Sequence, residues 1–403
     1  MTQPDPRPEL RPHALIVGAG AAGLSAAWWL DRAGWRTTVL ERAPDLRRDG
    51  YMIGLSGPGF EVARRMGILP ALRAHDRRIG ENVYRNRAGR QIVRLRYAEL
   101  LRGFEWITLS RTELVAELLA AARPVADIRF GVTVDAIEQD GERVTARLTD
   151  GTVEAADLLI GADGVHSAVR RLCFGADAAF ERPLGFRVAA FEAEDRLGLG
   201  HDFLSYSEPG RIAEFYTLAP RRLATLYIWR SPDAAAVPPA QRAHVLRRAF
   251  DDSHPDALRW IDNHPAGAPM FLDSMTLIEM PRWRTGRVLL LGDAAHCLTL
   301  LSGQGAGMAM ASANVLADEL ARGGGIDAAL DRHEARMRPA VARLQQRSRR
   351  IAGAFIPATR RGYALRNLSL RWMPRRLLAW YFMRNARSEV LAASADLGLD
   401  RPG

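Results

Sequence analysis

The feature that most constrains this chain is a glycine-rich loop between an apolar run and a helix near the N-terminus. Residues 14–17 read Ala-Leu-Ile-Val, which predicts a short buried strand, and the loop Gly18–Gly23 follows directly. Residues 24–33 predict a helix, and residues 37–40 predict a second buried strand that ends at Glu41. This order predicts a strand–helix–strand unit within a parallel sheet.

Each glycine of the loop has its own physical reason. Gly18 permits the tight turn, Gly20 lets a pyrophosphate approach the backbone, and Gly23 lets the helix pack closely on the strand. The helix N-terminus presents free N–H groups and partial positive charge to the phosphates. Glu41, eighteen residues after Gly23, is placed to accept hydrogen bonds from a ribose. The sequence therefore predicts a dinucleotide site, and this motif alone does not separate FAD from NAD.

The basic residues of the chain are all arginines, 56 in number, and the net charge is +10. Without lysine, the chain can form neither a phosphate-binding loop of the type that ends in lysine nor a Schiff base. The arginines are spread along the chain instead of gathering beside aromatic residues, so we expect no nucleic-acid partner. Their number reflects either nucleotide-composition bias in the source genome or, in part, the fit of the guanidinium fork to phosphate groups.

Composition also indicates the compartment and the size of the core. With 403 residues, 48% of them hydrophobic, the chain can form one large domain or two moderate ones. Two cysteines, Cys173 and Cys297, are too few for a disulfide framework or a thiolate metal site, so we expect a cytoplasmic protein. Residues 1–12 lack the apolar stretch of a secretory signal and are expected to form a disordered tail.

Two further glycine motifs follow predicted strands. Residues 157–160 predict a strand, and the next ten residues, 161–170, contain Asp163-Gly164. Residues 288–291 predict another buried strand, followed by Gly292-Asp293. A turn at residues 302–307, Ser-Gly-Gln-Gly-Ala-Gly, then opens a predicted helix over residues 308–320.

In this order and at these distances, the three motifs resemble the family of para-hydroxybenzoate hydroxylase, the class A single-component FAD-dependent aromatic monooxygenases. Residues 50–53 and 65–70 make the chain most similar to the short tetracycline-inactivating and polyketide-hydroxylating members. The resemblance covers residues 14–325. It implies an α/β fold: a Rossmann-like FAD-binding domain of the GR2 type, an inserted β-sheet substrate domain and C-terminal helices.

The resemblance also implies a division of the chain. The expected parts are a tail (1–12), a discontinuous FAD-binding domain (13–90, 101–173 and 280–325), a substrate domain (91–100 and 174–279) and a C-terminal helical region (326–403).

The family's cofactor contacts carry over to matching positions of this sequence. Asp293 would hold the ribityl hydroxyls of FAD, and the helix after Gly305 would point its N-terminus at the isoalloxazine ring. Arg111 would reach a phosphate or the ribityl chain, Val134 would contact the adenine through its backbone, and Asp163 would lie near the pyrophosphate and ribose. The expected cofactor-binding residues are Gly18, Gly20, Ala22, Gly23, Glu41, Arg42, Arg111, Val134, Asp163, Gly164, Gly292, Asp293, Gly303, Gln304, Gly305, Ala306 and Gly307.

The implied chemistry needs no catalytic side chain and no metal ligand, because the cofactor carries it. His166 and His296 occupy family positions that are not catalytic bases, so we expect structural or cofactor-adjacent roles for both. The resemblance implies non-covalent FAD, with NADPH or NADH docking transiently as reductant. O2 would then add to the reduced ring, and the resulting flavin hydroperoxide would hydroxylate an aromatic or polyketide-like small molecule.

Two other functions stay open at this point. Relatives usually carry proline just before the Gly-Gln-Gly turn, where this chain has Leu300. Loss of that proline favours the alternative of an FAD-bound, non-redox cyclase on the same scaffold in secondary metabolism. An NAD-dependent dehydrogenase would explain the first motif but would leave the second and third without a purpose.

The remaining segments carry weaker signals. Alternating patterns over residues 186–191, 212–218 and 223–229 predict strands of the substrate domain. Their aromatic residues can line a pocket or fill a core. Asp327 is expected to cap a long helix through Arg350. The basic amphipathic stretch 360–384 can lie on a membrane or pack on the main body, and we expect packing.

Overall fold

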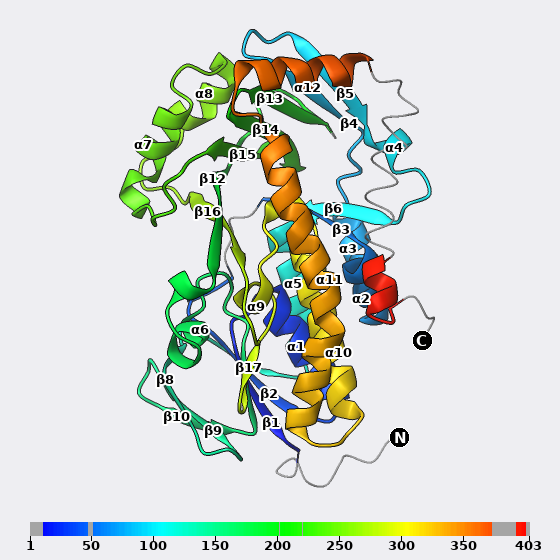
Figure 1. Cartoon of the computed structure of the whole chain (residues 1–403), viewed down its shortest axis with the longest axis vertical. Coiled ribbons are helices and arrows are strands. Elements are labelled where there is room, and N and C mark those ends of the chain that lie inside the picture. Colours follow the sequence, from blue (N-terminus) through cyan, green and yellow to red (C-terminus); the bar gives the residue numbers. More distant parts are fainter. Residues whose placement is uncertain (1–10, 47–50, 201, 220, 373–391, 400–403) are drawn as a thin grey trace.

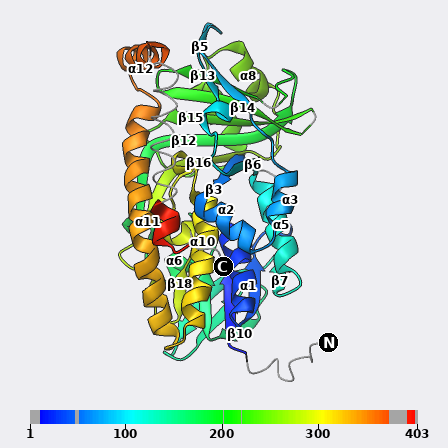
Figure 2. The ribbon, with the colours of Figure 1, turned by 90° about the vertical axis from the view of Figure 1, so that its right-hand side faces the viewer.

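The computed structural model describes residues 11–46, 51–200, 202–219, 221–372 and 392–399. Most of the expected tail, Gly50 and the stretch 373–391 lie outside these described residues. The described residues form two lobes, each built around one large sheet, and the helix α11 (Ile326–Phe355) runs along both (Figures 1 and 2).

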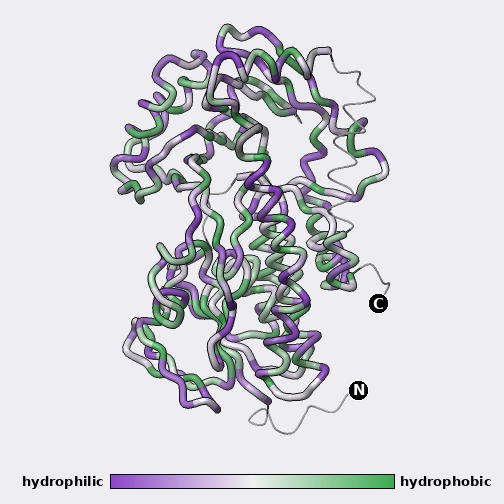
Figure 3. The backbone as a smooth tube through the Cα atoms, in the orientation of Figure 1, coloured by the Kyte–Doolittle hydropathy of each residue, from purple (hydrophilic) through white to green (hydrophobic). Residues whose placement is uncertain are grey.

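The first lobe contains a six-stranded sheet in the order β17-β18-β11-β1-β2-β7. Its neighbouring strands are parallel except for the pair β17–β18. The bounds are β1 (His13–Val17), β2 (Arg36–Glu41), β7 (Asp127–Phe130), β11 (Leu158–Gly161), β17 (Arg284–Thr285) and β18 (Val288–Leu290). The strands β1, β11 and β18 are buried and consist almost entirely of apolar residues, as expected for strands of a sheet that is covered on both faces. Hydrophobic stretches accordingly run through this lobe (Figure 3).

Helices cover this sheet, and two of them begin earlier than the sequence predicts. The helix α1 (Ala21–Arg32) starts inside the first glycine loop, and α10 (Gly305–Ala321) starts inside the glycine turn. The helix α1 packs against α10 and against α5 (Arg111–Ala122), whose first turn is closed by a capping box between Ser110 and Glu113. The short α6 (Ala168–Cys173) and α9 (Asp293–His296) follow β11 and β18.

Smaller elements complete the first lobe. A three-stranded sheet contains β8 (Val134–Gln139), β9 (Val144–Leu148) and β10 (Val153–Ala156), and β8 and β9 form a hairpin. The remaining elements are the strand pair β3 (Met52–Ser56) and β6 (Trp106–Ser110), and the helices α2 (Gly57–Arg65) and α3 (Leu69–Ala74).

The second lobe contains a seven-stranded sheet in the order β16-β12-β15-β14-β13-β4-β5. Its strands are β4 (Glu81–Arg85), β5 (Gln91–Arg96), β12 (Glu181–Glu194), β13 (Phe203–Glu208), β14 (Arg211–Ala219), β15 (Arg222–Arg230) and β16 (Phe271–Ile278). The sheet therefore includes residues 81–85, which the sequence-based division had placed in the FAD-binding domain. The helices α7 (Pro239–Ala249) and α8 (Pro255–Asp262) pack on its outer face, and α4 (Tyr97–Leu100) follows β5.

The C-terminal helices differ from expectation in two respects. Gly325, not Asp327, is the N-cap of α11; Asp327 lies in the first turn and accepts a 3.0 Å hydrogen bond from Arg284. In α12 (Arg360–Trp372), Tyr363 and Arg366 bind Ser207 of the second lobe. The apolar side chains Leu365, Leu368 and Trp372 are exposed, so the expectation that this stretch packs its apolar side on the main body is wrong for them. In the ranges described, no helix has both the length and the hydrophobicity that crossing a membrane requires.

Candidate functional site

The glycines of the first loop have different surroundings. A Cβ on Gly18, which has a φ of +109°, would lie 2.5 Å from the carbonyl oxygen of Ala162, and one on Gly23 would lie 1.9 Å from that of Gly18. A Cβ on Gly20 would meet no atom within 4 Å. Packing within the protein therefore explains why Gly18 and Gly23 are glycines. Gly20 leaves the backbone open above the N-terminus of α1, where a pyrophosphate would fit.

Glu41 is held at the carboxyl end of β2. Its two carboxylate oxygens accept hydrogen bonds from the backbone N–H groups of Ala19 and Ala43, each at 3.0 Å. The backbone N–H of Val132 donates to the carbonyl oxygen of Glu41 at 3.1 Å, which brings the segment leading to Val134 to the same edge. These contacts fix the carboxylate beside the glycine loop. Val134 is buried, and Arg42 is exposed next to Glu41.

The first and third motifs meet at Gly292. Its φ is +61°, and a Cβ there would lie 2.9 Å from the Cβ of Ala22 and 3.3 Å from that of Ala309. Only glycine allows α1, α10 and the end of β18 to approach this closely. The tight turn places Asp293 at the start of α10, where a Cβ on Gly305 would be 3.9 Å from its Oδ1.

Asp293, Arg111 and Tyr51 are neighbours. Burial raises the pKa of Asp293, while the positive charge of Arg111 and a hydrogen bond from Cys297 act to lower it. Burial likewise raises the pKa of Tyr51, against the effect of the same arginine. The backbone N–H of Arg111 donates to the carbonyl oxygen of Tyr51 at 3.1 Å. A carboxylate and a guanidinium thus share one partly desolvated site at the N-terminus of a helix, which suits polyhydroxyl and anionic groups.

The second motif uses Asp163 locally. Its carboxylate accepts hydrogen bonds from Ser167 Oγ at 2.5 Å, from the Ala168 N–H at 2.6 Å and from the Val169 N–H at 3.1 Å. The side chain therefore caps the start of α6. A cofactor would therefore contact this turn through the backbone of Asp163 and Gly164. Gly164 has a φ of +83°.

Arg170 has a structural role that the sequence reasoning missed. It is fully buried, and its guanidinium donates to the carbonyl oxygens of Val165 and Ala294 and to the carboxylate of Asp177. It thereby ties the second motif to the residue that follows Asp293. The only signal in the sequence is an arginine beside the apolar Val169 in a short helix, which is too common a pattern to predict burial.

The two motif histidines have different surroundings. The ring of His296 is buried 4.8 Å from that of Trp283, and burial lowers its pKa to about 3, so it is neutral. His166 is exposed and binds the carboxylate of Asp273 at 2.8 Å, and this hydrogen bond raises its pKa. His296 is a core residue.

The glycine turn at the start of α10 combines packing and polar contacts. A Cβ on Gly59 of α2 would lie 2.4 Å from the Cα of Gly307, so helix packing explains this glycine pair. The Gln304 side chain donates to Ser56 Oγ at 3.1 Å. Gly303, at a φ of +63°, ends the short 3-10 turn that begins at Leu300, and Ala306 lies in the first turn of α10.

Comparison with known proteins decides the family. A family model described as an FAD binding domain matches residues 11–348, most of the chain. The chain belongs to this family of FAD-dependent monooxygenases. It is 31% identical over 353 residues to the 3-amino-4-hydroxybenzoate 2-monooxygenase of Streptomyces cremeus, covering 84% of this chain and 86% of that protein.

Solved structures share the whole fold. The tetracycline destructase Tet(51) has a TM-score of 0.81 at 24% identity and covers 98% of this chain and 100% of its own. Klebsiella pneumoniae HpxO, in a complex with FAD and uric acid, has a TM-score of 0.77 at 25% identity and covers 94% of this chain and 97% of its own. The monooxygenase therefore has the expected α/β fold and FAD as its cofactor.

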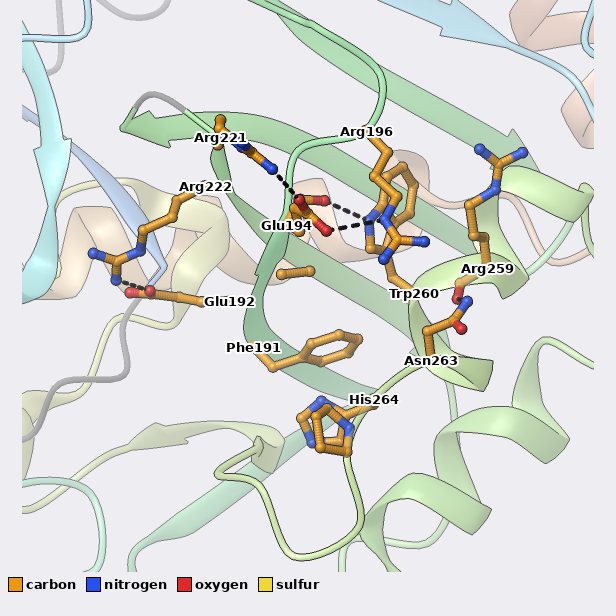
Figure 4. A pocket seen from close by; sticks show the side chains of 12 residues that line it. Phe191, Glu192, Glu194, Arg196, Arg221, Arg222, Arg259, Trp260, Asn263 and His264 are labelled. Atoms are coloured by element: carbon orange, nitrogen blue, oxygen red, sulfur yellow. Dashed lines mark hydrogen bonds and ion pairs between the residues drawn. The ribbon is translucent and has the colours of Figure 1, made fainter.

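A pocket of about 420 Å³ lies in the second lobe of this monooxygenase, and residues of the second lobe line it (Figure 4). Rings of Phe191, Trp260 and His264 form its apolar wall, and arginines ring its mouth. The glutamates at this mouth are already paired with Arg196, Arg221 and Arg222. Because Phe191 and Trp260 belong to the core between the sheet and α8, this pocket lies on the outer face and is not the flavin site.

The opposite face of the same sheet is turned towards the motifs. The aromatic residues that the sequence could not sort separate by strand alternation. Those packed in the outer core are Phe191, Tyr206, Phe215, Tyr227 and Trp229. Those on the inner face are Phe186, Phe203 and Tyr216. The hydroxyl of Tyr216 accepts a 2.5 Å hydrogen bond from the N–H of Met52, next to Tyr51. The inner face thus adjoins the group formed by Tyr51, Arg111 and Asp293.

Proposed function

We propose that this monooxygenase uses NADPH or NADH and O2 to hydroxylate an aromatic or polyketide-like small molecule. The observation that carries the proposal is the convergence of the motifs at Gly292. It sets Asp293, Arg111 and the N-terminus of α10 beside an inner sheet face rich in aromatic rings. Non-covalently bound FAD supplies the electron transfer from the nicotinamide and the transfer of one oxygen atom to the substrate.

The residues present fit FAD at each of its parts. The open backbone at Gly20 and the N-terminus of α1 would bind the pyrophosphate, with Glu41 on the adenosine ribose. Asp293 and Arg111 would bind the ribityl chain. The N-terminus of α10 would stabilise negative charge on the ring, since helix N–H groups there have no intrahelical partner.

The ligands of similar proteins support the substrate class. The Streptomyces cremeus relative is named for an aminohydroxybenzoate, and HpxO was solved with uric acid. Both compounds are planar and carry heteroatoms that donate electrons to a ring. The inner face carries aromatic rings, among them Phe203 and Tyr216, which pack edge to face on each other with centroids 4.8 Å apart. Aromatic side chains suit contact with such a planar molecule.

The experiment is to purify the protein and record its visible spectrum. NAD(P)H oxidation is then followed with a panel of phenols and polyketides. We expect a flavin spectrum, release of free FAD on heat denaturation and faster NAD(P)H oxidation with at least one compound. Flavin that stays with precipitated protein would contradict non-covalent binding. A flavoprotein that transforms its substrate without consuming NAD(P)H would instead be the non-redox cyclase.

A further inference from the structure

A polar cluster lies among the aromatic residues of the inner sheet face. Glu214 of β14 is held between apolar neighbours, and its Oε1 lies 3.1 Å from the hydroxyl oxygen of Ser205, its register partner on β13. The same hydroxyl oxygen lies 2.9 Å from Oδ1 of Asn82 on β4. The hairpin of β13 and β14 thus contributes two of these side chains, and β4, more than a hundred residues earlier in the sequence, contributes the third.

The hydrogen bonds of this cluster allow the carboxyl group to be protonated or ionised. Ser205, which also forms a hydrogen bond with Tyr84, has a single hydroxyl hydrogen and cannot donate to both Glu214 and Asn82. When Glu214 carries a proton, it donates to Ser205 Oγ, which in turn donates to Asn82. When Glu214 is ionised, the serine hydrogen turns to it, and Asn82 keeps its hydrogen bond with Tyr97.

Among the buried acidic groups of this sheet face, Glu214 is the one whose pKa lies near neutral pH. Desolvation raises its pKa to about 7. The titratable groups of this inner face are Tyr84 of β4, Tyr97 of α4 and Tyr216 of β14, with the guanidinium of Arg366 from α12 beside Tyr84. Tyr51 and Glu192 of β12 act on Tyr216 as well. Burial raises the pKa of each of these tyrosines, that of Tyr97 to about 12, so they keep their protons.

Glu214 also faces the flavin site. Ala213 and Phe215 belong to the outer core, whereas Ile212 and Tyr216, two residues away on either side, belong to the inner face. Tyr216 binds the backbone of Met52, and the adjacent Tyr51 lies beside Arg111 and Asp293. The Glu214 side chain is only partly buried, and Ser205 is its one hydrogen-bond partner among the described residues. Part of the carboxyl group is therefore available for a hydrogen bond with a molecule that binds between the inner sheet face and the cofactor.

We propose that Glu214 is a catalytic residue that binds the hydroxyl group of a phenolic or enolic substrate and removes its proton. In this step the substrate O–H bond breaks, an O–H bond forms on the carboxylate of Glu214, and the electron pair stays on the substrate oxygen. The resulting anion pushes electron density into the ring or double bond that receives oxygen, so proton removal favours the transfer. The inference rests on the proposed function and narrows its substrate class to molecules with an acidic hydroxyl group.

The test uses the FAD-loaded protein with 4-nitrophenol and 4-nitroanisole, which differ in whether the ring oxygen can donate a hydrogen bond. Ionisation of bound 4-nitrophenol is read from its own absorbance, so no turnover is needed. Dissociation constants and bound spectra are compared for the wild type, Glu214→Gln, Glu214→Met and the control Glu194→Gln. Glu194 lies at the end of β12 in the same sheet, where it pairs with Arg196 and Arg221 at the mouth of the outer pocket.

We expect the wild type to bind the phenol about tenfold to a hundredfold more tightly than its ether, and to hold it ionised at a lower pH than water does. Glu214→Met should lose this preference. Glu214→Gln should keep part of the preference, because its amide oxygen still accepts a hydrogen bond, but it should leave the bound phenol protonated. Glu194→Gln should behave as the wild type does.

Equal binding of phenol and ether by the wild type would overturn the inference, and so would an unchanged preference in both Glu214 variants with normal FAD content. Failure of the proposed function looks different. In that case no compound would stimulate NAD(P)H oxidation, while the phenol preference and its loss in Glu214→Met would still be observed.

Discussion

The two large sheets of this monooxygenase build their sites from different parts of the chain. At the six-stranded sheet the site is mostly backbone: an open N–H row at Gly20, a close approach at Gly292 and two helix N-termini. At the seven-stranded sheet it is made of side chains, with Glu214, Ser205 and Asn82 brought together by strand register. The first sheet suits a cofactor common to the family, and the second suits a substrate particular to this chain.

The largest effect should be the loss of stability when one carbon atom is added to the first glycine loop. In Gly23→Ala the new Cβ would lie 1.9 Å from a carbonyl oxygen that cannot move without breaking the turn. We expect a loss of more than about 4 kcal/mol in the free energy of unfolding, since such overlap exceeds ordinary overpacking. Urea unfolding of FAD-free protein measures this.

Gly20→Ala is the matched control, because its Cβ would meet no protein atom within 4 Å. It should change the stability of FAD-free protein by about 1 kcal/mol or less, and yet lower FAD content. If the two variants were equally unstable, the proposed distinction between packing glycines and a cofactor-contacting glycine would fail.

The second-largest effect should be the difference in FAD affinity between Asp293→Ala and His296→Ala, two substitutions in the third motif. Asp293→Ala removes the carboxylate that we propose accepts hydrogen bonds from the ribityl hydroxyls, so we expect FAD affinity to fall about tenfold to a hundredfold. His296→Ala removes a buried neutral ring and should lower stability through a cavity while leaving FAD affinity near that of the wild type. Fluorescence titration of FAD-free protein with FAD measures both affinities. Full flavin affinity in Asp293→Ala would argue against its assigned role.

The side-chain site should show itself in the pH dependence of stability. The folded protein holds the Glu214 proton more tightly than the unfolded chain, because burial raises the pKa of this carboxyl group from its ordinary value of 4.5 to about 7. Wild-type stability should therefore fall as pH rises from 4.5 to 7, by up to about 3 kcal/mol from this group. Glu214→Gln should lack this contribution and gain on the wild type over that range. Parallel stability curves for the two proteins, measured by urea unfolding, would contradict the buried protonated carboxyl group.

The smallest effect should come from Leu300→Pro, on the loop between the two regions. The preceding Thr299 has a ψ of 166°, which the restriction before proline tolerates, although its φ of +63° must relax. We expect unchanged FAD content and a modest decrease in hydrogen peroxide released per NAD(P)H, because a stiffer loop excludes water better. Peroxide is assayed alongside NAD(P)H consumption, and increased release in the variant would show that leucine is the better shield.

The sites of the two sheets also differ in how far the sequence predicts them. A glycine that packing requires leaves a local signature, so the roles of Gly18 and Gly23 could be predicted from the motif, and with them the fold of the cofactor lobe. Gly292 was expected only as a cofactor contact, and its packing against Ala22 and Ala309 depends on the tertiary structure. The place of Asp163 was predicted, but the use of its side chain as a helix cap depends on where α6 begins. The meeting of Asn82 with Glu214 depends on pairing between strands more than a hundred residues apart, which no local pattern encodes.

The central claim is that this protein transfers an oxygen atom from O2 to its substrate. The direct measurement is mass spectrometry of the product formed with NAD(P)H under O2 labelled with oxygen-18, with labelled water as the parallel reaction. The account predicts one heavy oxygen atom in the product from labelled O2 and none from labelled water. A product without label from O2, formed whether or not NAD(P)H is present, would contradict it and favour the cyclase.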